Sequence, residues 1–182
     1  MKAFRLTILA FILITATSHK TVAQTMTIDE LVASWDIMTT MVVESAKLMP
    51  DDCYEFVPVE PLRNFADQLN HTTSSNLGFA RIVNAGRPSF PLPDRNNPPQ
   101  SKEEVIDILE KSFAHFRAGL ASLSEEDLDD MMDWGPQSNR RQIPRLRAIM
   151  IVISHLQREH GKTMMYLRLN GITPAPAGSF AG

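Results

Sequence analysis

Two histidines and a carboxylate are the residues of this chain whose types and spacing could bind a metal ion. His155 and Glu159 lie four residues apart in a segment with helical periodicity, so both can point from one helix face at a single ion. His71, in the run Leu69-Asn70-His71, could supply a third ligand from a facing helix. Three protein ligands leave a coordination position open for water or substrate, as catalytic metals require.

A metal is one of two ways to satisfy these side chains. Apolar residues line two faces of the segment that holds His155 and Glu159, so both face the interior, where unpaired polar groups cost several kcal/mol. A divalent ion would compensate both, and imidazole with carboxylate suits Zn, Ni, Fe or Mn. Alternatively, a simple hydrogen bond between His155 and Glu159 would satisfy both side chains without a metal. His160 could replace Glu159 as a ligand if the helix is rotated, but the two residues lie about 100° apart around the helix, so they are not expected to bind one ion together.

Four helical segments would position these side chains. Apolar residues recur at helical spacing in segments expected at about residues 27–49, 64–86, 101–121 and 144–170. Capping boxes mark the first and third starts, with Gly171 as the last stop. A proline-rich loop, residues 87–100, separates the second and third segments. Because no convincing strand pair is found, the pattern predicts an all-α four-helix bundle.

Residues 1–24 have the pattern of a cleavable secretory signal peptide, with a basic start, an apolar run and small residues near Ala23. The apolar run, Leu6–Ala16, is shorter than the roughly 20 residues that span a bilayer, so we expect no stable membrane anchor. We therefore expect an exported protein, periplasmic or secreted. Its bundle domain would occupy residues 25–175, followed by a flexible tail at residues 176–182.

The exported protein would be acidic. Residues 1–24 hold three basic residues and no acidic ones, so their removal changes the formal net charge from −3 to −6. This charge, with no basic cluster, argues against nucleic acid as a partner. The single cysteine, Cys53, excludes an internal disulfide framework.

Two stretches of the sequence resemble the DinB-like (DinB/YfiT) superfamily of metalloenzymes. They are Pro61–Asn76, which contains Leu69-Asn70-His71, and the helix with His155 that closes on Tyr166-Leu-Arg-Leu-Asn-Gly-Ile172. The resemblance covers nearly the whole mature chain. It implies a four-helix bundle with a divalent metal, usually Zn or Ni, held by three histidines. The better-understood members are thiol-dependent transferases and isomerases, and others are called hydrolases.

The resemblance makes His71 the first metal ligand and His155 the second. The third ligand of the family falls at Glu159, and His160 occupies the next position. Glu is a competent ligand, so the resemblance implies a site of His71, His155 and Glu159, with His160 as a neighbouring group or general base. Alternatively, the ligand set is broken and the protein is a non-catalytic binding module without metal.

The leading expectation is an exported, metal-dependent enzyme that acts on an unidentified small-molecule substrate, as a hydrolase or a thiol-dependent transferase. Low-molecular-weight thiols are mainly cytoplasmic, so export argues against thiol transfer and favours hydrolysis or simple binding. A homodimer formed through an exposed face of the bundle is a further alternative.

Overall fold

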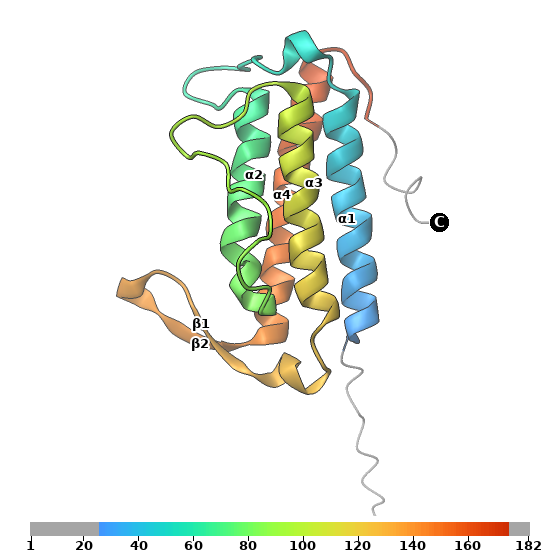
Figure 1. Ribbon diagram of the computed structural model, residues 1–182. Helices are drawn as coiled ribbons and strands as arrows, with labels where there is room; N and C mark the ends of the chain where they lie inside the picture. Colours follow the sequence, from blue (N-terminus) through green and yellow to red (C-terminus); the bar gives the residue numbers. More distant parts are fainter. Residues whose placement is uncertain (1–25, 175–182) are drawn as a thin grey trace, which may run out of the picture.

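The computed structural model describes residues 26–174, which form four α-helices packed as a bundle (Figure 1). The helices are α1 (Ile28–Leu48), α2 (Phe65–Phe79), α3 (Lys102–Ala121) and α4 (Arg145–Leu169). Short 3-10 turns occupy Asp51–Cys53, Ala80–Val83, Glu126–Asp129 and Gln137–Asn139. The predicted helical bundle is confirmed. The predicted signal peptide, residues 1–24, and the tail at residues 176–182 lie outside the described residues.

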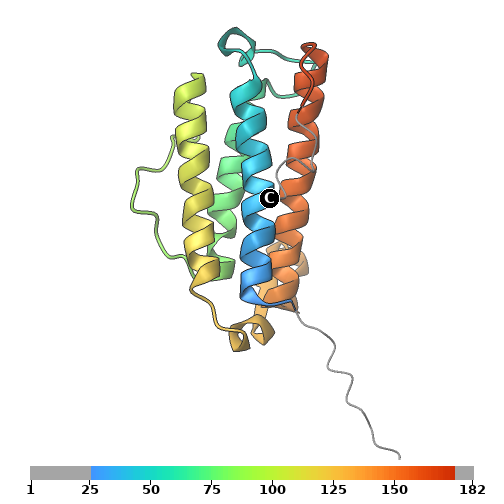
Figure 2. The same cartoon turned by 90° about the vertical axis from the view of Figure 1, so that its right-hand side faces the viewer.

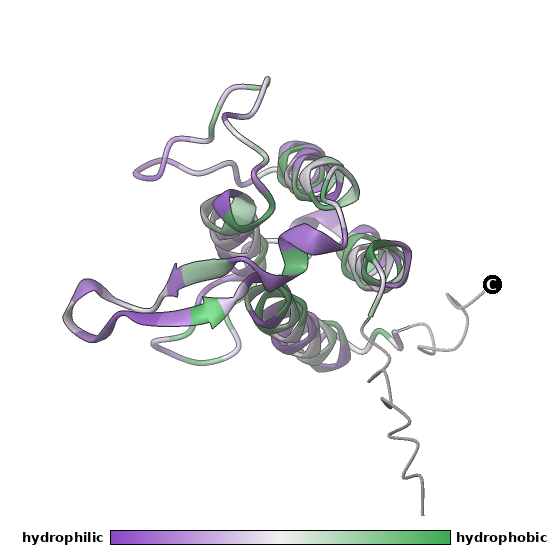
Figure 3. Ribbon diagram, turned by 90° about the horizontal axis from the view of Figure 1, so that it is seen from below, coloured by the Kyte–Doolittle hydropathy of each residue, from purple (hydrophilic) through white to green (hydrophobic). Residues whose placement is uncertain are grey.

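The expectation that no strands pair is wrong. Strands β1 (Met131–Trp134) and β2 (Arg141–Pro144) form an antiparallel hairpin in which Met132 pairs with Ile143. Seen along the helices, this hairpin extends beyond the bundle (Figure 3). Each strand has only four residues, too few for a clear alternating pattern, so sequence periodicity did not reveal them.

The helices are arranged so that α2 and α4 are neighbours. Both α1 and α2 pack against α3 and α4, and Figure 2 shows α1 in front of α2. In Figure 1, α1 and α4 run upward whereas α2 and α3 run downward, so the chain must return along the bundle between α2 and α3. Residues 84–101 make this crossover. Long crossovers of this kind are one of the two ways of connecting four-helix bundles.

Side-chain caps fix the helix starts where the sequence predicted them. Thr27 and Glu30 form a complete capping box, in which each side chain accepts a hydrogen bond from the backbone N–H of the other residue. Asn64 caps α2. At α3 the Ser101 hydroxyl accepts from the N–H of Glu104 at 3.4 Å and donates to its carboxylate at 2.8 Å. Helices α1, α2 and α3 therefore begin at positions dictated by local sequence.

The two predicted helix ends had different outcomes. α4 ends as predicted, because Gly171 has φ +74° and its N–H donates to the carbonyl of Arg168 at 3.0 Å. In contrast, α2 ends at Phe79, earlier than expected. The helical segment continues as the 3-10 turn Ala80–Val83 and ends at Asn84, which has φ 54°. No helix within residues 26–174 is both long enough and apolar enough to cross a membrane.

The core lies where the four helices meet. Trp35 of α1 stacks on Phe116 of α3, with ring centroids 4.3 Å apart, and its Nε1 donates to the carbonyl of Phe113 at 3.3 Å. A hydrogen bond is needed here because Trp35 is almost fully buried. Leucine, isoleucine and phenylalanine side chains from all four helices complete this core, among them Leu31, Phe65, Leu109 and Ile149.

A buried arginine holds the end of the bundle where the hairpin enters α4. Arg145 is 6% exposed, and its guanidinium donates to the carbonyls of Ile82 at 2.6 Å and Asp127 at 2.9 Å. It also pairs with the Asp130 carboxylate at 2.9 Å. A buried guanidinium needs this complete set of acceptors. The contact therefore fixes α4 relative to the 3-10 turns Ala80–Val83 and Glu126–Asp129.

The close packing of α3 on the turn after α2 predicts the effect of one substitution. A Cβ atom at Gly119 would lie 2.7 Å from the Val83 carbonyl oxygen and 2.8 Å from the Ala85 Cβ. Gly119→Ala is therefore expected to lower the free energy of unfolding by about 1–3 kcal/mol, measured by urea denaturation.

The matched control is Gly78→Ala in α2, where an added Cβ would meet nothing within 4 Å. Because alanine has a greater helix propensity than glycine, Gly78→Ala is expected to raise the free energy of unfolding by about 0.5–1 kcal/mol. Equal stability of the Gly119→Ala variant and the unsubstituted protein would contradict the packing described for α3.

Candidate metal centre

The three predicted ligands lie together between α2 and α4. His71 comes from α2, whereas His155 and Glu159 come from one face of α4. One ligand atom from each residue lies within 4.8 Å of the others, and within residues 26–174 no other such group of His, Cys, Asp or Glu is found. Ligands at about 2.0–2.2 Å from one ion are at most ~4.4 Å apart, so the cluster has nearly the dimensions of a metal site.

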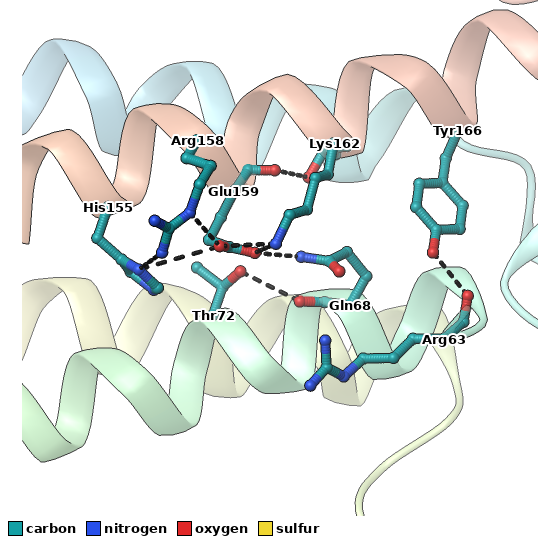
Figure 4. Close-up of polar contacts among 9 residues, drawn as sticks. Arg63, Gln68, Thr72, His155, Arg158, Glu159, Lys162 and Tyr166 are labelled. Atoms are coloured by element: carbon teal, nitrogen blue, oxygen red, sulfur yellow. Dashed lines mark hydrogen bonds and ion pairs between the residues drawn. The ribbon is translucent and has the colours of Figure 1, made fainter. Parts of the chain in front are cut away.

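The carboxylate of Glu159 is buried and surrounded by nitrogen donors (Figure 4). Gln68 Nε2 of α2 donates to Oε2 at 2.6 Å, and Lys162 Nζ donates to both oxygens at 2.8 and 2.9 Å. Arg158 Nε adds a longer contact of 3.4 Å. Burial raises the pKa of Glu159, but the hydrogen bonds from Lys162 and Gln68 outweigh it and hold that pKa below its usual value. Glu159 is therefore ionised at neutral pH.

His155 has one nitrogen engaged and the other without a partner. Its Nδ1 lies 2.6 Å from the Arg158 guanidinium, and arginine can only donate, so Nδ1 accepts. Its Nε2 is buried and has no hydrogen-bond partner within residues 26–174. A metal on Nε2 would require the proton on Nδ1, so Arg158 would have to move away. The Arg158 side chain is 66% exposed and can do so.

Both histidines of the cluster are in the form that binds metals. Burial lowers the pKa of His71 below its usual 6.5, and the nearby charge of Arg63 lowers it further. Burial is also the main reason that the pKa of His155 is lowered. Both imidazoles are therefore neutral at pH 7, and each has a lone pair on one nitrogen, which in His155 is the Nδ1 that accepts from Arg158.

This donor set fits a divalent metal ion. Two neutral imidazoles and one carboxylate are ligands that Zn, Ni, Fe and Mn accept, and the unpartnered Nε2 of His155 is a buried polar atom that an ion would satisfy. The positive charges of Lys162 and Arg158 oppose metal binding, because they already compensate the negative charge of Glu159 and would repel a cation. Binding therefore requires these two cations to yield part of their contact with the carboxylate.

The structure does not bring His160 together with the three ligands. Its Nε2 lies 3.2 Å from the Ser45 hydroxyl of α1, and His160 is only 5% exposed. The cause is the rotation of about 100° between adjacent helical residues, which turns His160 toward α1. The role of general base suggested for His160 therefore has no support from its contacts. The contact with Ser45 instead satisfies the buried imidazole of His160. Burial lowers the pKa of His160.

Several residues of the site were not singled out from the sequence. Gln68 and Lys162 could have been found as helical neighbours of His71 and Glu159, since residues three apart share a helix face. The hairpin contacts the site through Trp134, whose ring stacks on that of Phe79 with centroids 6.1 Å apart. The Phe79 ring in turn meets the edge of His155, at 5.4 Å between centroids.

Two hollows flank the cluster. The polar hollow, about 490 Å³, is bordered by Arg63, Asn70, His71 and Arg95. The apolar groove, about 460 Å³, is lined by Leu62, Arg63, Lys162, Met165 and Leu169. Arg63 thus borders both hollows.

Solved structures with similar folds were found in three bacteria. A DinB-like protein, YjoA, from Bacillus subtilis is 19% identical, with a TM-score of 0.64, and the match covers 81% of this chain and 96% of that one. A DinB-like protein from Bacillus cereus is 17% identical, with a TM-score of 0.70, and the match covers 82% and 97%. A conserved protein from Enterococcus faecalis is 17% identical, with a TM-score of 0.59, and the match covers 80% and 98%.

At these identities the structures establish likeness of fold alone. A comparison with curated proteins gave no match. The sequence model of a family described as the DinB superfamily matches residues 34–164, which include all three clustered ligands. Because this match spans well over half of the sequence and agrees with the helical bundle, the chain belongs to the DinB superfamily.

Proposed function

We propose that this protein is an exported, metal-dependent hydrolase that binds one divalent ion through His71, His155 and Glu159. Zn or Ni is the first choice for the ion, with Fe or Mn as alternatives. The observation that carries the proposal is the unpartnered, buried Nε2 of His155 inside a cluster of three ligand-type side chains. Export is supported by the sequence pattern of residues 1–24, and it favours hydrolysis over thiol transfer.

The residues around the cluster would have distinct roles. A bound ion would supply Lewis acidity, which polarises a carbonyl or lowers the pKa of a water. Gln68 orients the Glu159 carboxylate by its short hydrogen bond. Lys162, which reaches the same carboxylate from the apolar groove, places a positive charge where a developing oxyanion could be stabilised. The polar hollow beside His71 gives a small substrate access to the cluster.

A second candidate function is a binding module that holds no metal. It is favoured by one specific observation, which is that both oxygens of Glu159 already accept hydrogen bonds from Gln68 and Lys162. A buried carboxylate satisfied in this way needs no ion. The hollows beside the cluster would then bind a ligand without transforming it.

Metal content separates the two candidates. The purified mature protein is expected to contain one equivalent of a divalent metal by elemental analysis, because both imidazoles are neutral and Glu159 is ionised at neutral pH. The double variant His71→Ala/His155→Ala should lose it, since only one ligand remains.

The control is His115→Ala, which removes a histidine that lies against Phe90 outside the cluster. It should retain the metal. If neither the unsubstituted protein nor the control binds metal after Zn, Ni, Fe and Mn are added in turn, the enzymatic proposal fails and the binding module stands.

Removal of the lysine charge should tighten metal binding. Lys162→Met removes a positive charge that contacts Glu159 at 2.8 Å. Weaker repulsion is expected to raise the affinity for the ion by about tenfold, measured by competition with a chromophoric chelator. Lys111→Met, which breaks an exposed pair with Asp107, is the control and should leave the affinity unchanged. In a metal-free module, Lys162→Met would instead lower stability, and added metal would not restore it.

Metal retention should depend on pH through the two histidines. Because the pKa values of His71 and His155 lie below 6.5, both bind metal without releasing a proton at neutral pH. Metal content after dialysis is therefore expected to stay constant from about pH 8 down to near neutrality and to fall only at more acidic pH. Loss that begins above pH 7 would show that another group controls the site.

A further inference from the structure

Arg63 occupies an unusual position, at the boundary between the polar hollow and the apolar groove. Its backbone is fixed, because its carbonyl accepts a hydrogen bond of 2.6 Å from the Tyr166 hydroxyl. Its guanidinium has no hydrogen bond or ion pair within residues 26–174, and Arg63 borders the polar hollow together with His71. Arg63 therefore presents an unpaired guanidinium beside the cluster (Figure 4).

The acidic residues of the polar hollow form no ion pair with Arg63 within residues 26–174. Asp67 accepts a hydrogen bond from the Gln100 amide at 3.1 Å, and Asp94 accepts one from the backbone N–H of Asn96 at 2.9 Å. Both carboxylates thus have neutral partners from the crossover loop. Two arginines and two aspartates border the polar hollow, so its formal charges balance, and the preference for an anion depends on the apolar groove that Arg63 also borders.

The apolar groove combines exposed hydrophobic side chains with positive charge. Leu62, Met165 and Leu169 are 52%, 60% and 59% exposed and lie together in it. The charged residues that line it are Arg63 and Lys162, and no carboxylate does so. Exposed apolar side chains gathered in one concave surface mark binding sites, and the volume of about 460 Å³ is typical of small-molecule sites.

We infer that the ligand of these two hollows is a small amphipathic anion, whose carboxylate or phosphate is bound by Arg63 and whose apolar part lies against Leu62, Met165 and Leu169. This inference rests on the proposed function, of which it names the substrate class. Guanidinium binds both head groups through paired hydrogen bonds. The apolar groove contributes by removing the hydrocarbon part from water.

Binding of unreactive probes tests this inference directly. Octanoate and octyl phosphate are titrated into the mature protein, both metal-free and loaded with Zn, and binding is followed by calorimetry. Both protein forms are expected to bind at least one of the two, and the tighter of the pair identifies the head group. Octylammonium, which has the same chain and the opposite charge, should bind at least about tenfold more weakly. Acetate and inorganic phosphate, which lack the chain, should also bind more weakly.

Matched variants locate the two parts of the site. Arg63→Met should weaken binding of the preferred probe by about tenfold, whereas Arg147→Met, which removes an exposed arginine outside both hollows, should change it less than about twofold. Met165→Ser should also weaken binding. Its control is Met131→Ser in the hairpin, where the methionine is 58% exposed compared with 60% for Met165.

The outcomes distinguish this inference from the proposed function. Equal binding of octylammonium, or equal effects of Arg63→Met and Arg147→Met, overturns the inference even if the protein binds metal. Probe binding that depends on Arg63 in a protein that binds no metal upholds the ligand class and rejects the enzyme. Binding to anionic phospholipid vesicles without binding of either free probe assigns the groove to a membrane surface and also overturns the inference.

Discussion

The buried carboxylate of Glu159 is the constraint on which the arrangement of α2 and α4 depends. An ionised carboxylate removed from water destabilises the fold by several kcal/mol unless it is paired and hydrogen-bonded. Gln68 can reach it only if α2 lies directly against α4, and Lys162 must fold back one helical turn to do the same. The approach that satisfies Glu159 also brings His71 to His155, so one polar contact organises the whole cluster.

The parts of the fold that sequence predicted are those with local causes. The capping box at Thr27 and the stop at Gly171 depend on side chains and backbone angles within a few residues, so the sequence alone indicates them. The hairpin depends on pairing across a turn between two very short strands. The acceptors of Arg145 are carbonyls and a carboxylate supplied by packed turns, so only the folded chain shows why this arginine is buried.

The candidate site was predictable to a similar extent. Spacing places His155 and Glu159 on one face of α4, and it correctly separates His160 from them. His71 was a candidate from its residue type, but only the resemblance to a family made it the first ligand beside His155, because no local rule pairs residues on distant helices. The charges around Glu159 were not predicted, since periodicity indicates which face a lysine or an arginine occupies but not how a flexible side chain will fold onto a buried acid.

The crossover loop has a consequence for how this protein could diversify. Residues 87–100 supply Pro93, Asp94 and Arg95 to one wall of the polar hollow, whereas the three clustered ligands belong to the helices. The entropy of closing a loop rises slowly, by only about 0.6 kcal/mol for each doubling of its length. Insertions or replacements in this segment could therefore reshape what the hollow admits while the bundle keeps its stability. Descendants of one ancestral sequence could in this way acquire new ligands through the loop and inherit the helices unchanged.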